Sequence, residues 1–200
     1  MVRFASAALV AVLSVCTLQA APLKIGSPAP KFSGLECAST GKSCSLADLK
    51  NKDVVVFVIT CNHCPVAKAY EDRLIEFAKK YGADSKVQLV AFSVNDSEAD
   101  SLPNMKERAK EKGFNFPYLY DGSQKIAREL GASSTPEFFV FNKERRLVYT
   151  GAMDDNMNAG KVTKHYVEDA VDAALKGETP KTATTPAVGC GIQYSKSTEK

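Results

Sequence analysis

The chain has 200 residues, of which 44% are apolar and 24% charged, and its formal net charge is +3. Domains commonly run to roughly 100 to 200 residues, so this length suits one compact domain with additional segments. The basic residues, as at Lys79-Lys80 and Arg145-Arg146, have acidic residues nearby in the sequence. Because the basic residues form no continuous stripe, we do not expect the protein to bind nucleic acid.

The first twenty residues have the pattern of a secretory signal peptide. Arg3 precedes an apolar run over 5–15, and small residues follow at Ala20 and Ala21. The run is shorter than the roughly 20 residues that a membrane span needs. We therefore predict cleavage near Ala20 and a periplasmic or extracellular protein that keeps no stable membrane span. A lipoprotein box ending at Cys16 is a minor alternative, since Val15 is bulky where such boxes have a small residue.

Strands and helices are expected to alternate through one domain, residues 22–176. A lead-in hairpin is predicted around the turn at 39–42, followed by a buried strand at 54–60. Apolar residues at helical spacing predict a helix from Pro65 that ends at Gly82. Next we expect a strand at 87–94, a helix at 103–112, a strand at 118–120, a helix at 123–130, strands at 138–141 and 147–150, and a helix at 160–175. This alternation is typical of an α/β fold.

After Lys176 the composition changes to Gly, Glu, Thr, Pro, Lys and Ala. Such a segment cannot build a core, so residues 177–200 are predicted to form an extended or mobile tail. Residues 188–194 regain apolar character, which makes this part of the tail a candidate to dock back onto the domain.

The cysteine count also carries information. Removing the leader takes away one of the six cysteines, Cys16, and an odd number remains in a compartment that favours disulfides. Cys37 and Cys44 flank the predicted turn, so a structural disulfide across the hairpin is expected. Cys190 is then the unpaired thiol, an accessory resolving cysteine, or a partner for one hairpin cysteine.

The sequence Cys61-Asn62-His63-Cys64-Pro65 lies between a buried strand and the first turn of a helix. A helix N-terminus offers unpaired N–H groups and partial positive charge, which favour a thiolate at Cys61. We expect Cys61 to act as the nucleophile and Cys64 as the resolving residue of a redox-active disulfide, with no other cofactor. A protonated His63 between them would lower the pKa of the thiol and make the disulfide more oxidising.

The chain resembles the thioredoxin superfamily over residues 22–175. Beside the Cys-Xaa-Xaa-Cys junction, the resemblance rests on Thr135-Pro136 just before the strand at 137–141. More narrowly, the hairpin lead-in, the segments 60–65, 69–74 and 151–155, and Gly189-Cys190 are similar to the redoxin branch, which includes peroxiredoxin-like proteins. The resemblance implies a three-layer α/β/α fold with a central mixed sheet and an N-terminal hairpin extension. It also implies a cis bond at Pro136, with Thr135 and Pro136 presenting backbone to an extended substrate.

The function that this resemblance implies is that of an exported thiol-disulfide oxidoreductase. Its partners would be protein or small-molecule thiols and disulfides. His63 favours an oxidase or isomerase, although exported members of the branch also include reductants, so the direction stays open.

Two departures from the family patterns bear on mechanism. Thioredoxin has a tryptophan before its first cysteine and a buried aspartate six residues earlier, where this chain has Thr60 and Val55. Peroxiredoxins carry a proline and a threonine seven and three residues before the peroxidatic cysteine, and counting back from Cys61 gives Val54 and Val58. A thiol peroxidase with antioxidant activity is therefore a second, less favoured hypothesis.

Metal binding is a third hypothesis. Two thiolates and the imidazole of His63 would suit Cu(I) in a copper chaperone. Alternatively, Cys61 and Cys64 would be half of a structural zinc site, but zinc cysteines usually come as two short-spaced pairs. We therefore predict no metal. His165 is interpreted as a surface residue, and Asp154-Asp155 either line the site or form a solvated turn.

Overall fold

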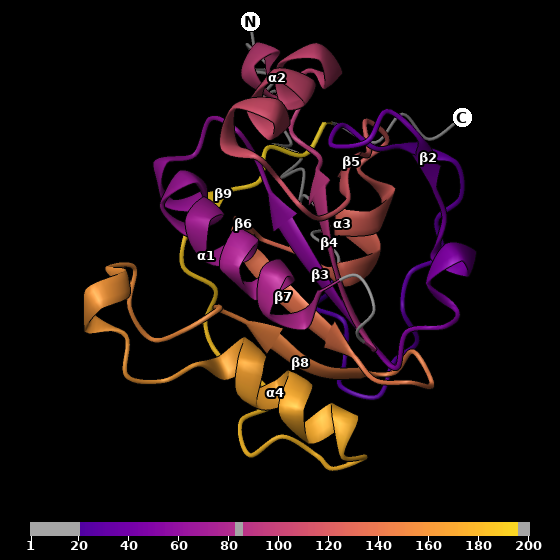
Figure 1. Ribbon diagram of the computed structural model, residues 1–200, viewed down its shortest axis with the longest axis vertical. Helices are drawn as coiled ribbons and strands as arrows, with labels where there is room; N and C mark the ends of the chain where they lie inside the picture. Colours follow the sequence, from indigo (N-terminus) through magenta and orange to yellow (C-terminus); the bar gives the residue numbers. More distant parts are fainter. Residues whose placement is uncertain (1–20, 83–85, 196–200) are drawn as a thin grey trace, which may run out of the picture.

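A computed structural model describes residues 21–82 and 86–195, and its centre is a five-stranded mixed sheet (Figure 1). The strand order is β5-β4-β3-β7-β8. The bounds are β3 Val54–Thr60, β4 Val87–Ser93, β5 Tyr118–Tyr120, β7 Glu137–Phe141 and β8 Leu147–Gly151. β3 pairs parallel to β4 and antiparallel to β7. The predicted α/β class is confirmed.

The central strand β3 is buried on both faces. All seven of its residues are buried. Val54, Val56 and Val58 belong to one core cluster, which includes apolar residues of α1 and α4, whereas the alternate positions belong to a second cluster with α3. Side chains alternate across a strand, so only a continuous apolar run can fill two such cores.

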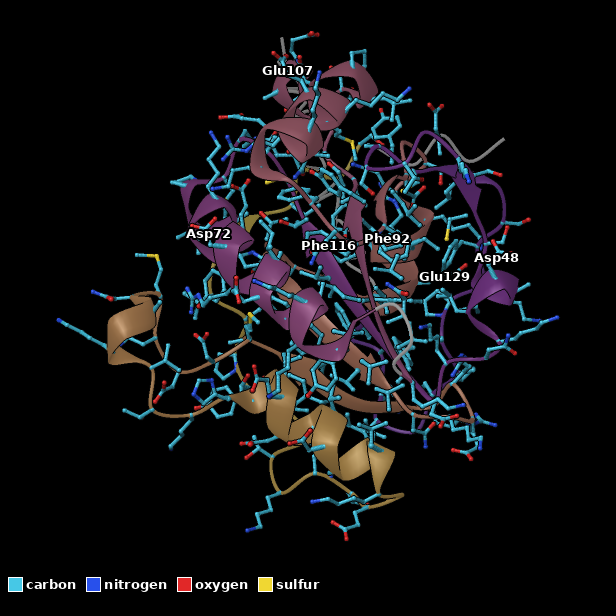
Figure 2. The ribbon with its side chains drawn as sticks, viewed as in Figure 1. Asp48, Asp72, Phe92, Glu107, Phe116 and Glu129 are labelled. Carbon is cyan, nitrogen blue, oxygen red and sulfur yellow. A yellow bond between two sulfur atoms is a disulfide. The ribbon has the colours of Figure 1, made fainter. Side chains whose placement is uncertain are left out.

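Within the described part of the chain, four α-helices flank the sheet and produce the three layers. They are α1 Pro65–Tyr81, α2 Leu102–Lys112, α3 Lys125–Leu130 and α4 Tyr166–Leu175, and short 3-10 helices cover Leu46–Leu49, Glu98–Asp100 and Ala159–Lys161. In Figure 1, α1 and α4 cross in front of the sheet. In Figure 2, the aromatic side chains of Phe92 and Phe116 lie inside the molecule, and the carboxylates of Asp48, Asp72, Glu107 and Glu129 lie at its surface.

The N-terminal hairpin is present, but the disulfide predicted across it is wrong. β1 (Leu35–Glu36) pairs with β2 (Ser43–Cys44) so that Cys44 lies opposite Leu35. Cys37 lies two residues further along, and its Sγ is 3.2 Å from the hydroxyl of Ser39. Both cysteines are free thiols. The register of the hairpin, which the sequence spacing does not give, keeps them from being cross-strand partners.

The last helix begins at Tyr166, six residues later than the predicted start at residue 160. The preceding stretch is held in another conformation by Asp155, which accepts hydrogen bonds from the backbone N–H groups of Thr163 and Lys164 at 2.9 and 3.1 Å. His165 precedes the first turn of α4 and is exposed, as expected for a surface histidine.

The described part of the C-terminal segment is extended, and it lies against the domain. β9 (Cys190–Gly191) pairs antiparallel with β6 (Ser134–Thr135). Ile192 and Tyr194 pack on the second core cluster. The yellow segment in Figure 1 follows this path from α4 to the neighbourhood of β6. We call residues 179–195 the C-terminal strap.

The predicted signal peptide, residues 1–20, lies outside the described residues. Among the helices within 21–82 and 86–195, none combines the length and apolar character that crossing a bilayer requires.

The cysteine pairing gives a direct test of this fold. Protein is unfolded in guanidinium and alkylated without reductant. Of the cysteines within the described residues, Cys37, Cys44 and Cys61 should each carry a label, and Cys64 and Cys190 should remain joined in a disulfide. Peptide mass mapping measures both. A Cys37–Cys44 bridge with a labelled Cys190 would contradict the structure.

Candidate active site

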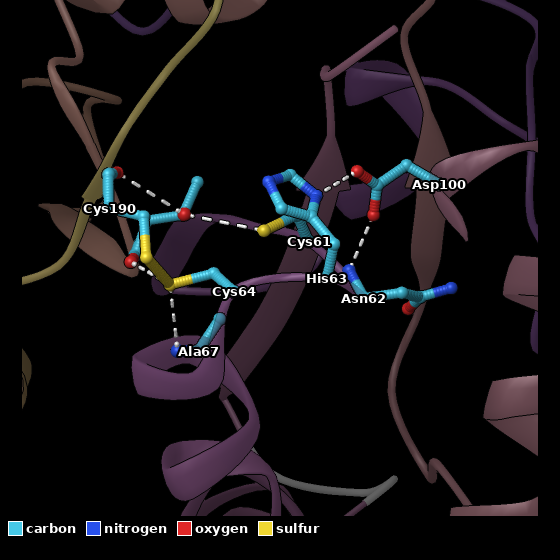
Figure 3. Close-up of a disulfide and its surroundings, with 8 residues drawn as sticks. Cys61, Asn62, His63, Cys64, Ala67, Asp100 and Cys190 are labelled. Carbon is cyan, nitrogen blue, oxygen red and sulfur yellow. Dashed lines mark hydrogen bonds and ion pairs between the residues drawn. A yellow bond between two sulfur atoms is a disulfide. The ribbon is translucent and has the colours of Figure 1, made fainter. Parts of the chain in front are cut away.

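Three cysteines meet where β3 ends and α1 begins (Figure 3). Cys61 directly follows β3, Cys64 directly precedes α1, and Cys190 comes from β9. A disulfide joins Cys64 to Cys190, with a Cα–Cα distance of 6.1 Å that is ordinary for such bonds. Cys61 is the free thiol. The sequence interpretation paired Cys61 with Cys64, and the structure therefore corrects it.

Thr135 contacts all three cysteines. Its Oγ1 lies 3.3 Å from the Sγ of Cys61, and its carbonyl oxygen lies 3.3 Å from the Sγ of Cys64. Its hydroxyl also donates to the carbonyl oxygen of Cys190 at 3.4 Å. The Thr135–Pro136 peptide bond is cis, and both residues are buried. Thr135 is thus part of the site, and its backbone pairs with Cys190 of the chain's own strap.

Cys64 sits at the N-terminus of α1 as its N-cap residue. The backbone N–H of Ala67 donates to its Sγ at 3.5 Å, and Pro65 occupies the first turn, where a missing N–H removes no helical hydrogen bond. Partial positive charge at a helix N-terminus stabilises a nearby thiolate. Cys64 is therefore placed to leave as a thiolate when its disulfide is broken.

A buried carboxylate beneath the motif escaped the sequence interpretation. Asp100, at the end of a 3-10 helix, is fully buried and accepts hydrogen bonds from the backbone N–H of Asn62 at 2.6 Å and from the hydroxyl of Ser97 at 2.8 Å. Its second oxygen also pairs with Nδ1 of His63. Its position in the sequence, after the predicted strand at 87–94, could have identified it. Asp100 follows β4, and the carboxyl ends of parallel strands β3 and β4 share one edge of the sheet.

The side chain of Asn62 completes the support of this loop. Its amide nitrogen donates to the carbonyl oxygen of Ala99 at 2.9 Å, and its oxygen accepts from the hydroxyl of Tyr118 at 2.9 Å. Burial raises the pKa of Tyr118 and keeps that hydroxyl as a donor. The two residues between the motif cysteines thus hold the loop in place by hydrogen bonds.

The thiol of Cys61 is less acidic than a free cysteine. Burial, which leaves the residue only 2% exposed, raises its pKa, and the negative charge of Asp100 adds to the effect. The hydroxyl of Thr135 acts in the opposite direction without overcoming burial. The ring of His63 is paired with Asp100. Of His63, only the backbone N–H, and not the imidazole, acts to lower the Cys61 pKa, so the net lowering predicted from the sequence is not found.

One group of side chains has the composition of a metal site. Ligand atoms of Cys61, His63 and Asp100 all lie within 4.8 Å of one another. This set offers one sulfur, one nitrogen and one oxygen, whereas the copper hypothesis needed two thiolates, and Cys64 is held in a disulfide. A hard oxygen donor does not favour Cu(I). His165 and the hairpin cysteines Cys37 and Cys44 are not in this group.

The two acidic residues after β8 differ in their burial. Asp154 is buried, accepts from the hydroxyl of Tyr70 at 3.2 Å and pairs with Arg73. Asp155 is exposed. The two residues support the loop after β8 and do not contact the cysteines.

The fold that carries this site agrees with comparisons to known proteins. The redoxin family model matches residues 24–171. The chain belongs to the redoxin family. Its fold is that of the thioredoxin superfamily, and no curated protein sequence matches it.

Two solved structures are similar over most of their length. An uncharacterized conserved protein from Geobacillus kaustophilus is 34% identical, with a TM-score of 0.79 over 87% of this chain and 94% of that chain. A hypothetical protein from Sinorhizobium meliloti is 35% identical, with a TM-score of 0.80 over 88% of this chain and 98% of that chain. A thiol:disulfide interchange protein from Chlorobium tepidum shares the fold at 23% identity, with a TM-score of 0.55 over 68% of this chain and 92% of that chain.

Replacing Asp100 tests its electrostatic role. In Asp100→Asn the negative charge that raises the Cys61 pKa is gone, so this pKa should fall and iodoacetamide should label Cys61 faster at pH 8. Loss of the charged acceptor for Asn62, Ser97 and His63 should also lower the free energy of unfolding by about 1–3 kcal/mol. The pH dependence of labelling and thermal unfolding measure the two effects.

Asp72→Asn is the matched control, because its side chain is 81% exposed and a surface ion pair contributes little. An Asp100→Asn protein with the labelling profile and melting temperature of this control would show that Asp100 has no such role.

Proposed function

We propose that the chain is an exported thiol-disulfide oxidoreductase whose chemistry is centred on Cys61 and Cys64. The observation that carries the proposal is a free thiol and a disulfide in one buried site. The sulfurs of Cys61 and Cys64 each lie 3.3 Å from an atom of Thr135, and Cys64 is bonded to Cys190. A thiol beside a disulfide is the reactant pair of thiol-disulfide exchange.

The internal exchange step follows from this arrangement. The thiolate of Cys61 attacks the Sγ of Cys64, a Cys61–Cys64 bond forms, and the Cys64–Cys190 bond breaks. Cys190 leaves as a thiolate and takes up the proton that Cys61 lost. No electrons enter or leave the protein in this step, so the site changes which two sulfurs are joined while remaining oxidised.

The environment of Cys61 favours the reductive direction. Strong disulfide oxidants of this fold are those whose reduced form is stabilised by an acidic thiol. Here burial raises the pKa of Cys61, and the imidazole of His63 is directed to Asp100. We therefore propose a reductant of protein or small-molecule disulfides, in place of the oxidase or isomerase that His63 suggested in the sequence.

The same property argues against the thiol peroxidase hypothesis. A peroxidatic cysteine reacts as an exposed thiolate. Cys61 is buried with a raised pKa, and Cys64 is fully buried in a disulfide. Neither meets that requirement in this state.

The reduction potential is the decisive measurement. Protein equilibrated with thiol buffers of known potential should show a reversible couple near or below thioredoxin's value of about −270 mV. Cys64→Ser should abolish the couple because every exchange passes through Cys64. Cys44→Ser, which changes a partly buried thiol outside the site, should leave the couple unchanged. A value near about −120 mV would reverse the direction, and no reversible couple in the wild type would remove the function.

Export is part of the proposal and rests on the leader pattern in residues 1–20. Expressed with its leader in a Gram-negative host, the chain should be recovered from the periplasm with Ala21 as its first residue. Mass spectrometry of the intact protein measures this. Recovery from the cytoplasm with residues 1–20 intact would contradict export.

A further inference from the structure

Of the three cysteines in the site, Cys190 is the one that is not buried. Cys61 is 2% exposed and Cys64 is fully buried, whereas Cys190 is partly exposed. Thiol-disulfide exchange with an external molecule requires access to the sulfur that is attacked. In this state an incoming thiol therefore meets the Cys190 end of the disulfide first.

The position of Cys190 is built into the backbone of the strap. Ser134 pairs with Gly191 and Thr135 with Cys190, and the N–H of Ile192 donates to Ser133 at 3.1 Å. A Cβ on Gly189 would lie 2.0 Å from the carbonyl oxygen of Thr135. Only glycine allows the strap to approach the loop this closely, and the approach places the next residue beside Cys64.

Contacts that do not involve the disulfide hold the strap on both sides of Cys190. Before it, the Oγ1 of Thr185 lies 2.6 Å from the hydroxyl of Tyr149 and accepts from the N–H of Ala152 at 2.9 Å. Because these bonds do not depend on the disulfide, we expect them to keep this part of the strap on the domain after the disulfide is broken.

After Cys190, the buried side chain of Gln124 donates to the carbonyl oxygen of Gln193 at 2.9 Å and accepts from the N–H of Ser195 at 2.8 Å. The hydroxyl of Tyr194 donates to Ala132 at 2.7 Å. A thiol held from both sides has a high effective concentration toward its neighbour. The strap is therefore a resident part of the site.

We propose that Cys190 is the third redox residue of the site and the one that exchanges with the external partner, a proposal that rests on the proposed function. The partner thiolate attacks the Sγ of Cys190, the Cys64–Cys190 bond breaks, and Cys64 leaves as a thiolate at the N-terminus of α1. A second partner thiol then attacks the partner sulfur of the mixed disulfide and releases Cys190. The two partner thiols become one disulfide, and the protein gains two electrons and two protons.

The reduced site then reduces a target disulfide by the same steps in reverse. The Cys190 thiolate attacks the target, Cys64 resolves the mixed disulfide, and the Cys64–Cys190 bond returns. Exchange with Cys61 moves the disulfide to the buried Cys61–Cys64 pair. Cys64 is thus the central sulfur of a three-cysteine relay, with Cys190 at its outer end and Cys61 at its inner end.

The strap also restricts the class of partner. β9 occupies the edge of β6, where the resemblance implied pairing with an extended substrate. A peptide bound there would have to displace the strap and carry glycine before its cysteine. The relay therefore suits small thiols and protein thiols on exposed loops, which reach Cys190 without forming a strand on β6.

The location of the first mixed disulfide tests the relay in the wild-type protein. Oxidised protein is mixed briefly with reduced glutathione and quenched in acid, and the adduct is located by peptide mass spectrometry. We expect the adduct on Cys190 to exceed that on Cys61 or Cys64 by at least about tenfold, because access to the attacked sulfur controls the exchange. An adduct mainly on Cys61 or Cys64 would overturn the proposal.

A substitution gives a second measurement. Cys190→Ser keeps Gly189 and the anchoring bonds, and we expect its oxidised form to have a Cys61–Cys64 disulfide, because Cys190 is no longer a partner for Cys64. Glutathione should reduce this disulfide at least about tenfold more slowly than it reduces the wild-type protein, with Cys44→Ser as the matched control. Equal rates would overturn the role of Cys190 while leaving the proposed function intact. A wild-type disulfide that glutathione and dithiothreitol both fail to reduce would remove both proposals.

Discussion

The disulfide between Cys64 and Cys190 is the constraint on which the site depends. It joins residues 126 positions apart and fixes the strap to the first turn of α1. In the chain-entropy model, closing a loop of that length in the unfolded state corresponds to about 5 kcal/mol of stabilisation. Exchange to a Cys61–Cys64 bond would close a loop of only a few residues and give up most of this contribution. The stability of the fold therefore depends on whether Cys64 is bonded to Cys190 or to Cys61.

The electrostatics of the site are governed by a carboxylate and not by the histidine of the motif. Asp100 accepts hydrogen bonds from the backbone of Asn62 and the hydroxyl of Ser97, and it pairs with His63. Its charge and the burial of Cys61 both raise the pKa of that thiol. The histidine therefore contributes to the position of the loop, and the site lacks the acidic nucleophile of a strong disulfide oxidant.

The strap shows how a segment without a core of its own becomes ordered. Its polar composition is typical of a mobile tail, yet Thr185, Gln193 and Tyr194 each find hydrogen-bond partners on the domain. These partners satisfy strap backbone and hydroxyl groups that an unattached chain would leave to water. These hydrogen bonds and the disulfide offset the conformational entropy that the strap loses on ordering. Composition alone does not reveal such contacts.

The sequence by itself determined the elements and the place of the chemistry. The continuous apolar run at 54–60 required a strand buried on two faces, and Pro65 and Gly82 marked the ends of α1, because these are local properties of the chain. Only the tertiary structure decided which sulfurs are joined and what surrounds them. Cys190 and Asp100 reach the motif from distant segments of the chain. Cys37 and Cys44 do not form a disulfide because the hairpin pairs Leu35, and not Cys37, with Cys44. Disulfide partners and pKa values depend on distance and burial in space, and spacing along the chain does not specify them.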